Sequence, residues 1–405
     1  MQRTRLLQIL GFVIVPMLSI ASPLLAIPAI TSRYGAAGWS AVAIGQSVGA
    51  SLAVIVELGW GLTGPQRVAR QSRKARQQTL AISLTTKLLV LVPLVVIAAC
   101  ASFLLSPSFR LEAAAVAVGA TAYGLNSTWY FIGTGSSIKL LLSDAVPRLL
   151  CVAASAFLVF AGGALLVYPA VGVILPIVVS TVSVIHIERV STRQLHGLNM
   201  RRLVKTVAAQ GTALGGRALS AVYMSLPITL VSLVAPPAVP IFSAIERLQR
   251  IYLQVLAAAP NVMQKWVGQS KGLRRKYRRA AKSVTYNAAL GLLAGAGFTL
   301  VAPVMSTIVF AASIQIPMEY AAISGVLIFI VCTSRASGSI ALVAVGQVRA
   351  ILISAAVGAL VGVPSILVAA RMFGVPGALI GEVLAEVIVL LIQLRALRKH
   401  SAPPR

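Results

Sequence analysis

Charged residues, and acidic ones above all, are scarce in this sequence. Only 11% of the 405 residues are charged, and 8 Asp and Glu residues stand against 35 Lys and Arg residues. A soluble domain carries about 25% charged residues, so this class is excluded. The net charge of +27 would suit a disordered nucleic-acid binder, but 58% of the residues are hydrophobic and the mean hydropathy is +0.91. The composition therefore predicts an all-α integral membrane protein, with no nucleic acid among its partners.

Cysteine and histidine, the usual ligands of structural metals, are few. The cysteines lie singly within apolar runs, and no histidine has a second ligand at helical spacing: Cys100, Cys151, Cys332, His186, His196 and His400. This spacing predicts neither a metal site nor a disulfide framework. The sequence also lacks a phosphate loop of the type Gly-x4-Gly-Lys-[Ser/Thr]. We therefore expect no metal, no cofactor and no ATP bound by such a loop.

Long apolar runs dominate the chain. A helix needs about 20 apolar residues to cross the hydrocarbon core. The first run, from Leu6 to Ile30, is too long for the core of a signal peptide. The length rule predicts twelve transmembrane helices, at residues 6–30, 39–62, 79–105, 112–134, 144–163, 167–187, 208–234, 238–262, 284–311, 319–343, 348–371 and 375–397. The short connections leave no room for a large catalytic domain.

The basic residues predict the orientation in the membrane. With a cytoplasmic N-terminus, most of the 35 Lys and Arg residues fall in cytoplasmic connections, Lys139 and Arg148 among them. The opposite side then holds only Arg33, Arg110 and Arg371. Because Lys and Arg favour the cytoplasmic side, we expect both termini to be cytoplasmic.

A weak internal repeat indicates two halves. The basic segment 67–76 recurs as 265–282, about 200 residues later. We expect two pseudo-symmetric six-helix lobes of the same orientation, residues 1–200 and 201–405, with the substrate path between them. Glycines four residues apart predict close helix packing at Gly45, Gly49, Gly291, Gly295, Gly358, Gly362, Gly377 and Gly381.

Nine charged residues fall inside the predicted spans and away from their ends: Lys87, Arg217, Arg247, Arg250, Arg335, Glu57, Glu246, Glu382 and Glu386. A charge at membrane depth is costly, so it is usually paired or faces a water-filled cavity. Residues 246–250 lie about 10–17 Å along their helix from Val239, near the membrane middle. Glu246 and Arg250 share a helix face and are expected to pair, whereas Arg247 points about 100° away.

The five basic residues are candidates for substrate binding. If Arg217, Arg247, Arg250, Arg335 and Lys87 face one lumen, that lumen is electropositive and selects a phosphate-bearing anion. The alternative for Glu246 and its neighbours is an ion-pair network that only fixes helix packing. Lys87 has a further alternative, in which its side chain extends toward the head groups.

The acidic residues allow two interpretations. Glu382 and Glu386 lie four apart on one face and could share a proton or bind a coupling cation, or each could pair with a basic residue on a neighbouring helix. For Glu57, near the end of its helix, we favour a structural role beside Arg67 and Arg70.

Several segments match motifs in order along nearly the whole chain: Gly35-Ala-Ala-Gly38-Trp39, Glu57-Leu-Gly59-Trp60, Arg67-Val-Ala-Arg70, Trp129-Tyr130-Phe131-Ile-Gly133, Phe242-Ser-Ala-Ile-Glu246-Arg247 and Gly374-Val-Pro-Gly377. Together they resemble the motifs of bacterial polysaccharide (O-antigen type) flippases of the multidrug/oligosaccharidyl-lipid/polysaccharide exporter superfamily.

The resemblance implies a transporter of the bacterial cytoplasmic (inner) membrane rather than an enzyme. It would move an undecaprenyl-pyrophosphate-linked oligosaccharide to the outer leaflet by alternating access, with the lipid bilayer, and a polysaccharide polymerase and chain-length regulator, as partners. Two alternatives stay open. A multidrug or organic-cation antiporter of the same fold would need carboxylates facing its cavity. A membrane-embedded polysaccharide polymerase or ligase would usually carry a large outer loop.

Overall fold

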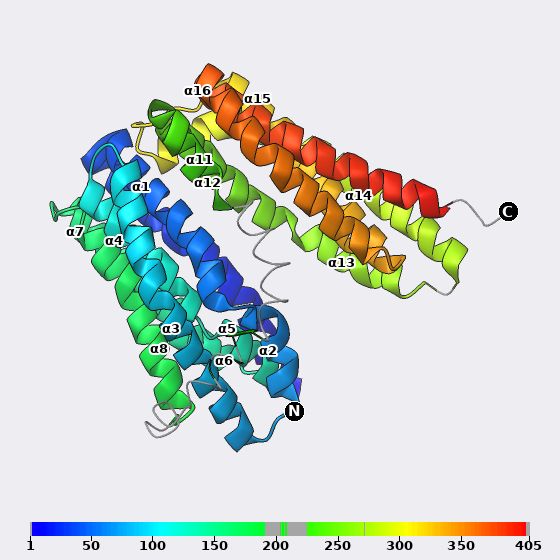
Figure 1. Cartoon of the computed structure of the whole chain (residues 1–405), viewed down its shortest axis with the longest axis horizontal. Helices are drawn as coiled ribbons and strands as arrows, with labels where there is room; N and C mark the ends of the chain where they lie inside the picture. Colours follow the sequence, from blue (N-terminus) through cyan, green and yellow to red (C-terminus); the bar gives the residue numbers. More distant parts are fainter. Residues whose placement is uncertain are drawn as a thin grey trace. The chain divides into compact units, whose positions relative to one another are not determined.

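The chain folds almost entirely into helices. The computed structural model describes residues 2–190, 203, 205, 207, 208, 225–270 and 272–401, and this part of the chain contains no β-strand (Figure 1). Seven helical stretches in it are long and apolar enough to cross a membrane. These helices agree with the expected multi-pass membrane protein. The count of twelve spans and the cytoplasmic termini stay predictions.

The described residues fall into two compact units, Met1–Thr229 and Leu230–Arg405, which are considered one at a time. The expected boundary between residues 200 and 201 lies outside the described residues, as does most of the seventh predicted span.

The first unit is built from elements that begin and end as follows: α1 (Gln2–Glu57), α2 (Trp60–Ala69), α3 (Arg73–Leu105), α4 (Arg110–Ala122), η1 (Tyr123–Leu125), α5 (Thr128–Thr134), α6 (Ser137–Leu140), η2 (Leu141–Ala145), α7 (Val146–Phe160), η3 (Tyr168–Ile174) and α8 (Leu175–Ile187). Of these, η1 is a 3-10 turn, whereas η2 and η3 are π-helical.

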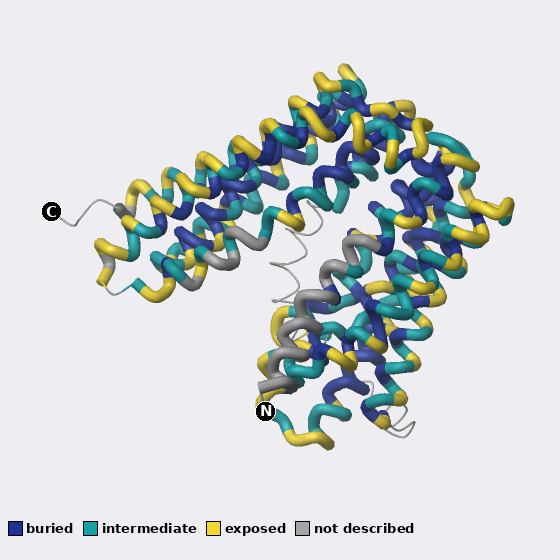
Figure 2. The backbone as a smooth tube through the Cα atoms, turned by 180° about the vertical axis from the view of Figure 1, so that it is seen from behind, coloured by how far each residue is buried: buried dark blue, intermediate teal, exposed yellow. Residues whose placement is uncertain are grey.

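The second unit begins within α11 (Pro227–Val234) and continues through η4 (Pro236–Ala238), α12 (Val239–Leu256), α13 (Ala258–Gly268), α14 (Leu273–Val309), α15 (Met318–Arg335), η5 (Ala336–Leu342) and α16 (Val348–Ser401). The segment η5 is π-helical and continues α15 directly. Buried and exposed positions alternate along the helices of both units, as expected when one side of a helix packs on its neighbours (Figure 2).

Two long helices each contain two of the predicted spans. α1 bends at Gly35 (φ 61°, ψ −160°), and α16 bends at Gly374 (φ 62°, ψ −129°). A backbone with positive φ favours glycine, which has no Cβ. The glycine at each bend therefore lets the chain change direction between two spans almost without a loop.

Three predicted spans differ in the structure. The second was expected to reach residue 62, but its helix ends at Glu57 because Leu58 and Gly59 have positive φ angles of 53° and 70°. The fourth, expected over 112–134, is interrupted after Ala122 and resumes at Thr128. The eighth, expected over 238–262, is divided at Ala257 into α12 and α13. The positions of the spans were predicted, but their interruptions were not.

Small residues allow close helix packing, as predicted for two of the glycine pairs. A Cβ atom on Gly45 or Gly49 would collide with the carbonyl oxygens of Ala113 and Ala117 on α4. In the second unit, a Cβ on Gly295 of α14 would collide with the backbone of Gly325 on α15. These glycines therefore bring helix backbones together.

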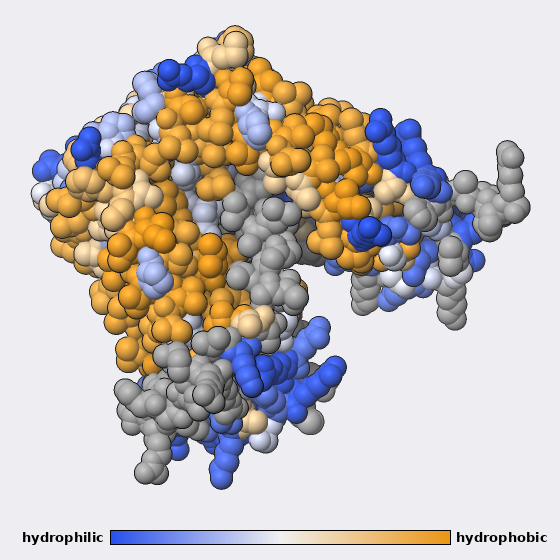
Figure 3. Space-filling model, in the orientation of Figure 1, coloured by the Kyte–Doolittle hydropathy of each residue, from blue (hydrophilic) through white to orange (hydrophobic). Residues whose placement is uncertain are grey.

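Large apolar side chains cover the outside of both units. Leu104 is 77% exposed, Leu360 76% and Leu293 73%. Figure 3 shows the hydrophobic surface over the sides of the helices and the hydrophilic surface at helix ends. Exposed apolar surface of this extent would promote aggregation in water, whereas it is the exterior expected of a protein in a lipid bilayer.

Candidate functional site

The middle of α12 carries the first part of the candidate site. Glu246 is buried, with only 5% of its surface exposed, and Arg250 lies one turn later. The Nε of Arg250 donates a hydrogen bond to Oε2 of Glu246 at 2.6 Å, and its second terminal nitrogen completes the ion pair. The predicted pairing is therefore confirmed. The side chain of Glu246 is only 7% exposed. That of Arg250 is 40% exposed, so part of the Arg250 side chain stays accessible.

Glu382 on α16 completes a cluster with the α12 pair. It is 6% exposed, and its carboxyl group lies within electrostatic range of Glu246. Arg250 and Glu386 also lie within electrostatic range of Glu382. The second unit thus brings Glu246 of α12 and Glu382 of α16 together near the guanidinium of Arg250. Carboxylates at such short range repel each other unless a proton or a cation lies between them.

Two further candidate arginines of this unit, Arg335 and Arg247, lie near or on the same helix. The Nη1 of Arg335, the last residue of α15, donates a hydrogen bond of 3.1 Å to the carbonyl oxygen of Leu253. This bond ties α15 to α12 near the point where α12 ends. Arg247 is half-buried next to Glu246 in the sequence. Three of the predicted cations, Arg247, Arg250 and Arg335, therefore belong to one region around α12.

Lys87 has a different environment, in the first unit. The expected alternative, a side chain that extends toward the head groups, is wrong, since Lys87 is fully buried. Its Nζ donates a hydrogen bond of 2.8 Å to the carbonyl oxygen of Asn126. Asn126 lies in the interruption between η1 and α5, where the helix leaves carbonyl groups without their usual partners. The ammonium group therefore stabilises a break in the fourth span.

A second buried ion pair near Lys87 was missed. Arg148 donates hydrogen bonds of 2.5 Å to both carboxylate oxygens of Asp144, and its guanidinium lies 4.5 Å from the ring centre of Tyr123. The pattern of basic residues predicts Arg148 in a cytoplasmic connection, but its side chain is only 17% exposed. The sequence signal for this ion pair is an acidic and a basic residue four positions apart at the start of the fifth predicted span.

A cavity with room for about one water molecule lies beside this ion pair. It is lined by Tyr123, Asn126, Asp144, Arg148, Ser180 and Thr181, among others.

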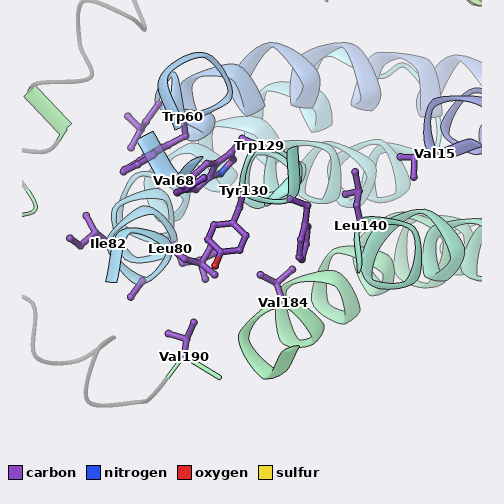
Figure 4. Close-up of a cluster of buried hydrophobic side chains, with 14 of the residues drawn as sticks. Val15, Trp60, Val68, Leu80, Ile82, Trp129, Tyr130, Leu140, Val184 and Val190 are labelled. Carbon is purple, nitrogen blue, oxygen red and sulfur yellow. The ribbon is translucent and has the colours of Figure 1, made fainter. Parts of the chain in front are cut away.

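The aromatic motif residues form the core at one end of the first unit. The rings of Trp60 and Trp129 stack with their centres 5.2 Å apart, and Tyr130 lies beside them (Figure 4). The hydroxyl of Tyr130 donates to Oε2 of Glu188 at 2.9 Å, and Lys139 pairs with Oε1 of the same residue at 2.7 Å. These motif residues therefore hold α2, α5, α6 and the end of α8 together.

The structure does not test the predicted roles of two site residues, Arg217 and Glu57. Arg217 lies outside the described residues. Glu57 ends α1 and lies within electrostatic range of Tyr123, so its expected role beside Arg67 and Arg70 stays a prediction. Within the described ranges, no group of three or more His, Cys, Asp or Glu residues is arranged to hold a metal ion.

The fold is similar to that of several solved transporters. An inward-facing multidrug resistance MATE family transporter of the MOP superfamily has a TM-score of 0.66 at 17% identity, and the match covers 94% of this chain and 96% of that one. The lipid II flippase MurJ has a TM-score of 0.64 at 11% identity, covering 97% and 87%. A MOP superfamily transporter from Pyrococcus furiosus, described as having a binding pocket of reverse polarity, has a TM-score of 0.54 at 12% identity, covering 97% and 94%.

These similarities show that the chain shares its overall fold with these solved transporters. At such low identity they extend to the fold and not to the substrate. No protein-family model and no curated protein sequence matches the chain.

Proposed function

We propose that the chain is a membrane transporter that moves a polyprenyl-pyrophosphate-linked oligosaccharide from the cytoplasmic to the periplasmic leaflet in surface polysaccharide biosynthesis. The observation that carries the proposal is the placement of Arg247 and Arg250 on α12 and of Arg335 against it. Guanidinium groups bind phosphate oxygens with two parallel hydrogen bonds and stay charged at every physiological pH. The accessible part of Arg250 supports binding of such an anion.

The proposed mechanism is alternating access. The pyrophosphate binds to the arginines of α12 while the polyprenyl chain stays in the bilayer. A membrane potential that is negative inside favours outward movement of the anion by about 2.3 kcal/mol per charge per 100 mV. The carboxyl groups of Glu246, Glu382 and Glu386 provide a place where a proton or a cation binds during the cycle.

A second candidate is a multidrug or organic-cation antiporter, and the same cluster supplies the observation that favours it. The buried carboxyl groups of Glu246 and Glu382, with Glu386 one turn further along α16, would attract a cationic substrate. The fold resembles the multidrug transporter and the lipid II flippase about equally well. The Pyrococcus furiosus protein supports the view that pocket polarity differs among proteins of this fold.

Transport by the purified chain in proteoliposomes distinguishes the two candidates. The wild type should transport a lipid-pyrophosphate-linked oligosaccharide and should not transport the organic cation ethidium. Arg247→Gln and the double variant Glu246→Gln/Arg250→Gln should each lower oligosaccharide transport at least about tenfold, because both remove a guanidinium that the phosphate needs. The double variant removes the two charges together, so it leaves no buried carboxylate without its partner.

The matched control is Arg349→Gln, which removes an exposed cation at the start of α16 and should leave transport unchanged. Movement of ethidium by the wild type, abolished by Glu382→Gln/Glu386→Gln, would instead establish the antiporter. Unchanged oligosaccharide transport in Arg247→Gln and in the double variant would contradict the proposal.

A further inference from the structure

One end of the second unit is strongly cationic. The first ten residues of α14 contain six basic side chains, and the last turns of α16 contain three more: Arg274, Arg275, Lys276, Arg278, Arg279, Lys282, Arg395, Arg398 and Lys399. Ala280 of α14 and Leu397 of α16 belong to the same apolar cluster, which includes Ala336 and Ile340 of η5, so both helix ends pack at the same end of the unit. We call this surface the basic end.

The basic end has no carboxylate of its own. Neither α13, the first turns of α14 nor the last turns of α16 contain an Asp or Glu. Figure 3 shows hydrophilic surface at this end, next to the hydrophobic sides of the unit. So many like charges repel each other unless anions from outside the chain gather around them.

Arg279 is already engaged inside the protein. Nη1 of Arg279 donates a hydrogen bond of 2.9 Å to the carbonyl oxygen of Trp266, and its guanidinium lies 5.2 Å from the centre of that ring. This contact fastens α13 to α14. In contrast, Arg274, Arg275 and Arg278 are exposed and line one side of the helix.

The exposed side of α14 changes in character along its length. Arg274, Arg278 and Lys282 follow one another at intervals of four residues, and Tyr286, 51% exposed, is the next in the row. About two turns further, Leu292 and Leu293 are 61% and 73% exposed. The order cation, tyrosine, leucine matches the order head group, interface, acyl chain in a bilayer leaflet. With 37 residues, α14 is about 55 Å long, so it extends well beyond a core of about 30 Å.

We propose that the basic end binds the phosphate groups of anionic phospholipids in the leaflet that adjoins it. The continuity of the cations with the lipid-facing leucines favours a lipid over a soluble anion or a protein. Arg274, Arg275 and Arg278 contact the head groups, whereas Arg279 holds Trp266 in place. This binding is independent of the substrate that the protein transports.

Trp266 makes the proposal measurable, because the other tryptophans, Trp39, Trp60 and Trp129, are buried in the first unit. The full chain in neutral detergent is titrated with brominated phosphatidylglycerol or brominated phosphatidylcholine, and Trp266→Phe identifies the contribution of Trp266 to the quenched fluorescence. In the wild type, phosphatidylglycerol should quench Trp266 at a concentration at least about tenfold lower than phosphatidylcholine. Anionic surfaces attract each nearby Lys or Arg, and these contributions add.

The variant Arg274→Gln/Arg275→Gln/Arg278→Gln should lose this preference. Replacement of the same three residues by Lys should keep it, since attraction to a head group depends on charge, and this variant also shows that the positions tolerate change. The matched control, Arg33→Gln/Arg110→Gln/Arg371→Gln, removes three charges elsewhere and should behave like the wild type. Equal quenching of the wild type by both lipids, or a preference kept by the Gln variant, would overturn the proposal.

Discussion

At the scale of single residues, the buried pair of Glu246 and Arg250 should respond asymmetrically to mutation. Arg250→Ala leaves Glu246 as a buried carboxylate without its counter-ion and should lower the free energy of unfolding by about 1–3 kcal/mol, less than for a fully buried pair because Arg250 is 40% exposed. Glu246→Gln removes the buried charge and should cost less. Thermal unfolding in detergent measures both, and equal losses would show that the charge of Glu246 needs no partner.

Lys87 gives a second prediction at this scale. Lys87→Met removes the donor to the Asn126 carbonyl and should destabilise the protein by about 1–3 kcal/mol, the cost of a buried acceptor left without a hydrogen bond. Its neighbour Leu88 is 45% exposed, so Leu88→Met is the matched control and should be nearly neutral. The sequence identified Lys87 as unusual, but its partner could not be predicted, because hydropathy does not reveal where a helix breaks. A Lys87→Met protein as stable as the control would contradict this role.

At the scale of elements, the bend in α1 depends on the backbone of Gly35. Gly35→Ala should destabilise the protein by about 1–3 kcal/mol through backbone strain alone, because nothing lies within 4 Å of the added Cβ. Gly268→Ala, at the end of α13, is the matched control, since it also meets nothing within 4 Å but lacks a positive φ. Thermal unfolding of the two variants compares them directly, and equal stability would mean that the bend does not need glycine.

The positions of helices could be predicted better than their interruptions. Hydropathy averaged over a span finds α3 and α14 because their apolar runs are long. It cannot find the break at residues 123–127 or the π-helical turns η2 and η5, because these depend on φ and ψ angles and on partners elsewhere in the fold. The same limit explains why the pairing of Asp144 with Arg148 was missed: both residues lie at the very start of the predicted span 144–163, and hydropathy does not reveal whether the end of a span is buried.

At the scale of the whole molecule, the sequence predicted the fold class and the membrane environment but not the full site. The pairing of Glu246 with Arg250 follows from the helical repeat, which is local. The approach of Glu382 to that pair depends on the packing of α16 against α12, and the sequence contains no local signal for it. In contrast, the aromatic motif around Trp129 is visible in the sequence, and its residues lie in the core of the first unit.

The orientation of α14 tests the topology of the whole chain. If this helix crosses the membrane once, its two ends face opposite compartments, with the basic end in the cytoplasm. In a variant without the three native cysteines, Ser313→Cys, in the connection after α14, should react with an impermeant maleimide added to cells with a permeabilised outer membrane. Gln269→Cys, before α14, should react only after the inner membrane is opened. Because each missing or additional span reverses every later connection, labelling of both positions from the same side, or with the sides exchanged, would refute the predicted arrangement of twelve spans.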